Sequence, residues 1–346
     1  MLDDLKMIHH RDAQDGLGFA ERQWQQLTHQ FDSSQTPVNA ENIVYAGMGS
    51  SALAADYSLS WPGYTLPFQI VRDYDIPEYV SDKTYFIAAS YSGNTEETLS
   101  ALAQAEARGA AIAVITSGGQ LAEIARTKGY PLVLLPSIVQ GRYGLLYNFR
   151  ALLLLAQQAG ILLEADVDTE LNRAVDVIKS SLESWLPTVP TVRNQAKQLA
   201  LEIIGESAVI YSGPKLAPAA LRFKMNLNEN AKHVAWRGQL PEFSHNEFTG
   251  WTKQPVDKPY AVVELQSELE HERTQKRFAV TNQLLSGLRP HSNIVEVQGS
   301  NMLEQLLWTS VYADFVTLYV ALLNEVNPTP VDLVERFKTI MEDNNE

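Results

Sequence analysis

The feature that most constrains the fold of this chain is a regular alternation of short apolar runs with helical patterns. In the first half, helical stretches such as "EETLSALAQAEARG" separate the runs "NIVYAGMG", "FQIVRD", "TYFIAAS", "AIAVITS" and "PLVLLPS". The second half repeats the pattern with "SAVIYSG", "YAVVELQ" and "SNIVEVQ". Alternation of strand and helix is typical of a parallel sheet covered by helices, so we predict a doubly wound α/β protein.

The two halves also share a local outline. "IVYAGMGSSALAA" and "AVIYSGPKLAPAA" each read as a strand, a glycine turn and an alanine-rich helix. A helical stretch from Tyr143 to about Thr188 separates the halves, and "PTVPT" ends it. After "NPTP", a last helix is predicted over "VDLVERFKTIM". We therefore expect two sheets of similar build, joined by helices and followed by a C-terminal helix.

Composition excludes several classes of protein. The chain has 346 residues, no cysteine and a formal net charge of −14. The charge argues against a nucleic-acid partner and against an anionic membrane surface. The lack of cysteine rules out disulfides and thiolate sites and fits the cytoplasm, where we expect the protein. The polar start "MLDDLKMIHHRDAQ" does not resemble a signal peptide, and Arg150 interrupts the most apolar run, which we interpret as a buried helix.

The first candidate site is "GMGSSA", at Gly47–Ala52, between a predicted strand and a predicted helix. Glycines let an anion approach the backbone, and a helix N-terminus favours negative charge. The same letters also fit a dinucleotide fingerprint, with Arg72 and Asp73 about 20 residues further on. A tight turn without a ligand is the third reading, and this motif alone does not choose among them.

The second candidate is "SYSGNTEET", which begins at Ser90. Asn94 suits the N-cap of the following helix and Glu97 suits the third helical position, as in a capping box. A well-capped helix leaves three hydroxyl residues unexplained, namely Ser90, Ser92 and Thr95. Hydroxyls that converge on amides at a helix start suit a phosphate monoester. Two glycine and serine turns on neighbouring strand ends therefore favour one small phosphate over a dinucleotide.

Four more residues are candidates for chemistry. Glu229 in "NENAK" could act as a general base, and His245 in "PEFSHNEF" could transfer protons near neutral pH. Arg142 in "GRYGL" follows the last strand of the first half, where doubly wound sheets bind ligands. Lys338 lies in the terminal helix. Each also has a simpler reading: a solvated helix end, a structural loop histidine, a surface salt bridge and a solvated lysine. The seven histidines form no metal-binding motif.

Together, six segments resemble the bifunctional phosphoglucose/phosphomannose isomerases, a family of the sugar-isomerase-domain (SIS) superfamily. The segments are "GMGSSA", "SYSGNTEET", "GRYG", "NENAK", "PEFSHNE" and "NPTP" with the later "FK". "SGNTEET" marks the superfamily, whereas the pairing of "NENAK" with "SHNE" marks this branch. The resemblance extends from about Asn42 to Met341, with Ser50 where members more often have glycine.

The resemblance implies an organisation of the chain. A polar arm or helix at 1–40, which we read from its residue pattern and which carries no family motif, precedes a first SIS domain at 41–152 with the phosphate-binding loops. A helical connector at 153–195 leads to a second SIS domain at 196–326, and a C-terminal helix occupies 327–346.

The resemblance also implies an activity: fructose 6-phosphate is interconverted with glucose 6-phosphate and mannose 6-phosphate through a cis-enediolate. Glu229 would move the proton between C2 and C1, Arg142 would stabilise the oxyanion, and His245 and Lys338 would assist ring opening. The phosphate would lie among Gly49, Ser50, Ser51, Ser90, Ser92 and Thr95. No metal or cofactor is implied. The partners implied are the sugar phosphate and a second copy, since family dimers share active sites, with the histidine from the partner subunit.

Two alternatives stay open at this point. A sugar-phosphate sensor would keep the phosphate loops without turnover, although such a binder has no need of Glu229, His245 and Lys338 together. An amino-sugar isomerase would act on glucosamine 6-phosphate. A nucleotide-dependent oxidoreductase fits poorly, because it gives the second loop no task.

Overall fold

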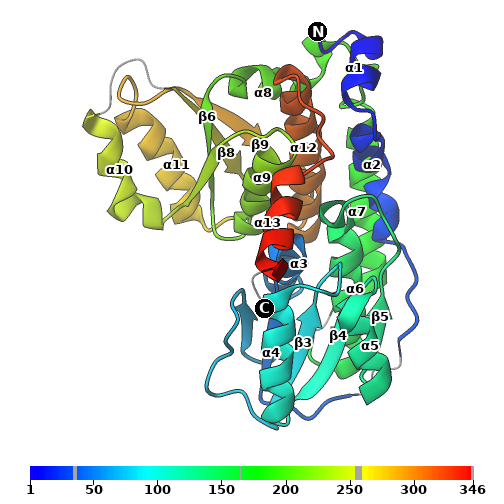
Figure 1. The fold of residues 1–346 in the computed structure, drawn as a ribbon. Helices are drawn as coiled ribbons and strands as arrows, with labels where there is room; N and C mark the ends of the chain where they lie inside the picture. Colours follow the sequence, from blue (N-terminus) through cyan, green and yellow to red (C-terminus); the bar gives the residue numbers. More distant parts are fainter. Residues whose placement is uncertain (34–36, 164, 254–258, 344–346) are drawn as a thin grey trace. The chain divides into compact units, whose positions relative to one another are not determined.

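The computed structural model describes residues 1–33, 37–163, 165–253 and 259–343 (Figure 1). The chain forms two compact units, each with its own parallel sheet. The five-stranded unit comprises Arg22–Ser180 and Gln298–Trp308. The four-stranded unit comprises the remaining segments, Met1–Glu21, Ser181–Val297 and Thr309–Glu346. The predicted fold class, two parallel α/β sheets followed by a C-terminal helix, is confirmed.

The five-stranded sheet has the order β2-β1-β3-β4-β5, and all neighbouring strands are parallel. All five strands predicted for the first half are present. They are β1 (Asn42–Gly47), β2 (Phe68–Val71), β3 (Thr84–Ala89), β4 (Ala111–Thr116) and β5 (Leu132–Leu134). The helices that join and cover them are α3 (Gly49–Ser60), α4 (Glu96–Ala107), α5 (Gly119–Lys128) and α6 (Leu145–Ala159).

Both faces of this sheet are apolar because it is covered on both sides. On β1, Tyr45 packs in the cluster that contains Ala55 of α3 and Leu152 of α6. Val44, its neighbour, packs in the other cluster, with Leu102 of α4 and Leu121 of α5. Since successive strand residues point to opposite faces, continuous apolar runs indicate a sheet buried on both sides. This arrangement brings the carboxyl ends of β1 and β3 to one edge.

The helical stretch predicted from Tyr143 to about Thr188 is two helices. α6 ends at Gly160, whose positive φ of 73° gives the left-handed conformation that closes a helix. α7 then runs over Val167–Leu182. Arg150 of α6 pairs with Asp168 of α7 at 2.7 Å, so the buried charge that interrupts the apolar run has an acidic partner.

The four-stranded sheet has the order β7-β6-β8-β9 and is also parallel. Three of its strands were predicted: β6 (Ser207–Ser212), β8 (Tyr260–Gln266) and β9 (Ser292–Glu296). β7 (Ala235–Gln239) was missed. Its sequence "AWRGQ" shows little apolar pattern because it is an edge strand with largely exposed side chains, Trp236 among them. The helices around this sheet include α8 (Gln195–Ile203), α9 (Ala217–Glu229) and α11 (Glu272–Leu284).

The remaining helices differ sharply in burial. α12 (Met302–Leu323) is, in the described parts of the chain, the one helix long and apolar enough to cross a membrane. Of its most apolar window, 94% is buried inside the protein, as expected for a core helix. α13 (Asp332–Asp343) instead leaves Leu333 and Phe337 exposed. The N-terminal residues form α1 (Leu5–Arg11), α2 (Gly16–Arg22) and a short 3-10 turn, Gln23–Gln26.

Candidate active site

The turn after β1 joins the end of a buried strand to the start of α3. Gly49, the first residue of the helix, has a φ of 51°, and a Cβ added there would meet no described atom within 4 Å. Ser51 is buried, and its hydroxyl accepts the backbone N–H of Tyr91 at 3.3 Å. The first N–H groups of a helix have no acceptor within that helix. The Ser51 and Ala52 N–H groups donate to the Met48 carbonyl, so the part of the helix start that faces open space is at Gly49, where the helix dipole favours an anion.

The turn after β3 brings the three predicted hydroxyl residues together. The Ser90 hydroxyl lies 2.7 Å from that of Thr95 and 3.4 Å from that of Ser92. It also accepts the Gly93 N–H at 3.2 Å. Gly93 has a φ of 73°, and a Cβ there would lie 1.9 Å from the carbonyl oxygen of Gly118. Only glycine fits this position, and it holds the hydroxyl turn against the loop after β4.

The capping box predicted for the following helix is wrong. α4 begins at Glu96, so its N-cap is Thr95 and Glu97 is its second residue. The Asn94 side chain instead accepts the backbone N–H of Gln120 at 3.0 Å, at the start of α5. Asn94 thus ties two strand-end loops together. Local spacing could not reveal this, because the competing amide lies 26 residues further along the chain.

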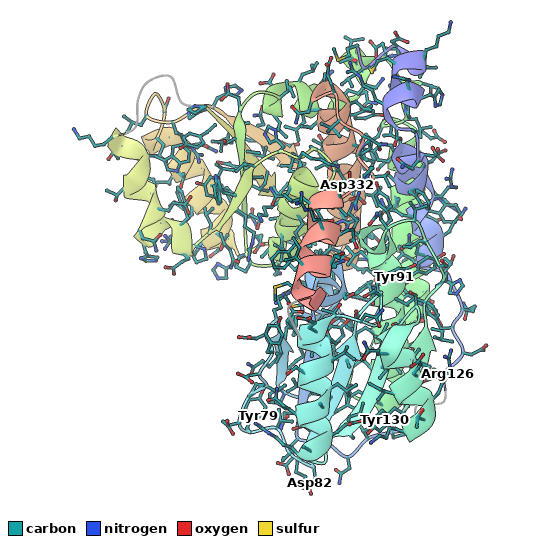
Figure 2. The ribbon with its side chains drawn as sticks, viewed as in Figure 1. Tyr79, Asp82, Tyr91, Arg126, Tyr130 and Asp332 are labelled. Carbon is teal, nitrogen blue, oxygen red and sulfur yellow. The ribbon has the colours of Figure 1, made fainter. Side chains whose placement is uncertain are left out.

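Sequence reasoning did not single out Tyr91 (Figure 2), which lies in the hydroxyl turn and contacts the segment before Arg142. Its hydroxyl donates to the Pro136 carbonyl at 3.0 Å and accepts the Ile138 N–H at 2.7 Å. Its ring lies so close to Gly141 that a Cβ there would come within 3.1 Å of it. Arg142 is 6% exposed and lies 4.7 Å above the Tyr143 ring. Arg142 is therefore buried and not on the surface, and it belongs to the same unit as both turns.

In the four-stranded sheet, a side chain of the protein fills the place equivalent to the turn after β1. By strand order β6 corresponds to β1 and β8 corresponds to β3. A Cβ added to Gly213, just after β6, would lie 2.3 Å from the Glu270 carboxylate. That carboxylate accepts the Lys215 N–H at 2.8 Å, and burial raises the pKa of Glu270. An acid of the chain itself occupies this place, which favours the five-stranded unit for phosphate.

Glu229 is the last residue of α9 and is half-buried. Beyond it, Lys232 adopts a φ of 51° and turns its ammonium back onto the helix end. This ammonium donates to the Glu229 carbonyl at 2.9 Å and to the carbonyls of Asn327 and Pro328 at 3.0 and 3.1 Å. The lysine of "NENAK" therefore joins the end of α9 to the "NPTP" segment that leads to α13.

His245 and Lys338 lie in the same unit as Glu229. His245 ends the 3-10 turn η4 (Glu242–His245) and is exposed. Lys338 is exposed on α13 and pairs with Glu335 at 3.0 Å. The candidate residues thus form two groups, each described within its own unit. The five-stranded unit holds Gly49, Ser50, Ser51, Ser90, Ser92, Thr95 and Arg142, and the four-stranded unit holds Glu229, His245 and Lys338.

Two family models match separate parts of the chain. Residues 38–134 match the SIS domain, and residues 192–341 match the bacterial phospho-glucose isomerase C-terminal SIS domain. A bifunctional phosphoglucose/phosphomannose isomerase of Caldicellulosiruptor bescii is 34% identical over 303 residues, 86% of this chain and 88% of that one. A D-glucosamine-6-phosphate 4-epimerase of Sulfolobus acidocaldarius is 37% identical over 216 residues, 62% of this chain and 65% of that one.

Solved structures show the same fold at lower sequence similarity. A glucose-6-phosphate isomerase like protein from Thermus thermophilus superposes with a TM-score of 0.67 at 19% identity. The match covers 98% of this chain and 99% of that one. With the two domain matches and the relative similar over most of its length, the chain belongs to the family of bifunctional phosphoglucose/phosphomannose isomerases.

Proposed function

We propose that this protein interconverts fructose 6-phosphate with glucose 6-phosphate and mannose 6-phosphate. The observation that carries the proposal is the cluster of Ser90, Ser92 and Thr95 hydroxyls beside the open helix start at Gly49. This is an anchor for a phosphate on C6, remote from the reacting carbons. Binding energy from such a remote group can be used to align C1 and C2 with the catalytic groups.

The proposed chemistry needs one base and one cation at the reacting carbons. From open-chain fructose 6-phosphate, Glu229 removes a proton from C1, and electrons move to O2 to give a cis-enediolate. Arg142 stabilises the negative charge on oxygen as it develops. Reprotonation at C2, with transfer of the O1 proton to O2, gives the aldose. The two faces of C2 give glucose and mannose 6-phosphate from one intermediate.

Ring opening precedes this step, since the sugar phosphates are mostly cyclic in solution. We assign it to His245 and Lys338, whose side chains can exchange protons with the ring oxygen and the anomeric hydroxyl. The site residues, like the domain boundaries implied by the resemblance, are part of the proposal. The reaction requires no group beyond these side chains, and we place it in the cytoplasm.

The test is turnover of fructose 6-phosphate by the purified protein in EDTA, with both aldose products quantified. We expect glucose and mannose 6-phosphate together. Glu229→Gln should lower turnover by about 10²–10⁴, the scale of a lost general base, with unchanged folding. Glu272→Gln, an exposed carboxylate at the start of α11, is the matched control and should be silent.

Other outcomes would redirect the assignment. Saturable binding of fructose 6-phosphate without product would indicate a sensor. Turnover of glucosamine 6-phosphate alone would indicate an amino-sugar enzyme, the class to which the Sulfolobus relative belongs by name. Near-normal activity of Glu229→Gln would remove Glu229 as the base while leaving the isomerase assignment in place.

We also propose a homodimer in which His245 serves the site of the partner subunit. Mixing His245→Ala and Glu229→Gln chains tests this, because a mixed dimer then contains one intact site. About a quarter of wild-type activity should return after random exchange of subunits, if the dimer has two-fold symmetry. No recovery, with subunit exchange shown by differently tagged chains, would place both residues in one subunit's site.

A further inference from the structure

The segment that carries His245 has few regular elements of its own. After β7 it consists of η4 (Glu242–His245), the single turn α10 (Glu247–Gly250) and η5 (Trp251–Lys253). Elements this short cannot hold a shape by their own hydrogen bonds. The position of His245 must therefore be set by what the segment contacts on the sheet.

Three of those contacts meet at Tyr211, near the end of β6. The Tyr211 ring is buried and meets the Phe243 ring edge-to-face at 4.9 Å between centroids. Its hydroxyl donates to the Glu247 carboxylate and accepts the indole N–H of Trp251 at 3.2 Å. One side chain of the sheet thus contacts the segment on both sides of His245.

A second set of bonds connects Glu247 and its neighbours to the turn that ends at His245. The Asn246 side chain donates to the Glu242 carboxylate at 2.9 Å and accepts the backbone N–H of Glu247. These hydrogen bonds connect the residues on either side of His245, and Glu247 connects them to the Tyr211 hydroxyl. Because burial and the adjacent Glu247 carboxylate raise the pKa of Tyr211, the hydroxyl keeps its proton and remains a donor.

Tyr211 is itself held from behind. The Arg289 guanidinium lies 5.7 Å from the Tyr211 ring centroid and forms a buried ion pair with Glu264 of β8. Arg289 also donates to the side chains of Asn282 and Ser292, at 2.7 and 2.8 Å. These partners hold the guanidinium in place over the Tyr211 ring. Gly238 of β7 also packs against the Tyr211 ring, because a Cβ at this position would lie 2.4 Å from it.

From these contacts we propose that Tyr211 and Glu247 are positioning residues for His245 in ring opening. This rests on the proposed function, because it assumes that His245 acts on the cyclic sugar. The Tyr211–Glu247 bond would hold the imidazole at the ring oxygen without touching the substrate. Its loss should slow ring opening and leave the later proton transfer between C1 and C2 unaffected.

The experiment separates the two steps with an acyclic substrate. Fructose 6-phosphate closes its ring through the 5-hydroxyl, so 5-deoxyfructose 6-phosphate stays open and bypasses ring opening. Exchange of the C1 proton in D₂O, followed by NMR, reports proton abstraction from both substrates. Tyr211→Phe should lower kcat/KM for fructose 6-phosphate by about tenfold, part of what full acid–base catalysis contributes, and leave the acyclic substrate within about twofold.

Three further variants sharpen the test. His245→Ala should show the same selectivity with a larger loss. Glu247→Ala should resemble Tyr211→Phe, whereas Glu247→Gln, which keeps a hydrogen-bond acceptor, should stay close to wild type. Glu247 is exposed, so its variants remain informative if Tyr211→Phe folds poorly. Tyr260→Phe is the matched control, because Tyr260 also contacts Trp251, through its ring at 5.5 Å, and should be silent.

Several results would overturn the inference. Equal losses on both substrates would make Tyr211 a structural residue, and no loss would remove it from the reaction. A selective loss in Tyr211→Phe that His245→Ala does not show would exclude a route through His245. A wild-type protein that turns over neither substrate would instead contradict the proposed function.

Discussion

At the residue scale, the hydroxyl turn after β3 contains more polar groups than a helix cap needs. Thr95 is the N-cap of α4, yet its hydroxyl makes no capping bond and lies against Ser90. We expect Thr95→Ala to raise KM for fructose 6-phosphate by about tenfold, since one good hydrogen bond to a charged group contributes about 1.5 kcal/mol or more. Steady-state kinetics with thermal melting would separate this from a loss of stability.

The matched control lies three residues further on. Thr98 of α4 is buried, and its hydroxyl has no hydrogen-bond partner among the described residues. Thr98→Val keeps the shape and removes only that hydroxyl, so KM should not change and stability should not fall. If Thr95→Ala left KM as it was, the turn would be a helix start and nothing more.

At the scale of elements, the end of α9 depends on Lys232. Its ammonium meets the negative end of the helix and the "NPTP" carbonyls together, so it holds Glu229 in place relative to the segment before α13. Lys232→Met should lower kcat by about tenfold, equivalent to about 1.4 kcal/mol of transition-state stabilisation, with a smaller change in KM. Lys232→Arg should lie between this variant and wild type.

Lys276→Met provides the comparison for this prediction. Lys276 is exposed on α11, so its loss changes the net charge by the same amount without touching α9. If Lys232→Met and Lys276→Met have equal kcat values, any loss comes from the change in net charge and not from the contacts of Lys232 at the end of α9.

At the scale of the whole molecule, a chain of net charge −14 must bind an anionic substrate. The long-range field repels a sugar phosphate, while amides, hydroxyls and Arg142 attract it at short range. Salt shortens the Debye length from about 30 Å at 0.01 M to about 10 Å at 0.1 M and so screens the repulsion more than the contacts. We expect kcat/KM for fructose 6-phosphate to rise over this range, by less than about tenfold, in potassium chloride.

The kinetic parameter kcat serves as the internal reference for the salt series. It reports steps after binding, so it should stay nearly constant while kcat/KM rises. If kcat/KM instead falls steadily with salt, the electrostatic potential that the substrate meets in solvent near the site is positive, despite the negative net charge.

Much of the fold could be predicted because its pattern is local. Eight strands and the main helices follow from apolar runs and periodicity, since burial repeats every two residues in a strand and about every 3.6 in a helix. β7 was not predicted, because an edge strand with exposed side chains does not require an apolar run in the sequence. The break between α6 and α7 depends on the conformation of Gly160 in an otherwise helical sequence.

The sequence by itself determined the α/β class, the hydroxyl turn after β3 and, through its resemblance to a family, the candidate residues. Only the tertiary structure decided which groups meet. The Asn94 side chain bonds an amide at the start of a helix 26 residues away. The Tyr91 hydroxyl bonds two backbone groups that lie 45 and 47 residues further along the chain. The Tyr211 hydroxyl bonds Glu247 at a separation of 36 residues. A hydrogen bond depends on distance and direction between two groups, and the packing of whole helices on a sheet sets both. Periodicity predicts whether a residue is buried. The residue to which it hydrogen-bonds depends on elements that are far away in the chain.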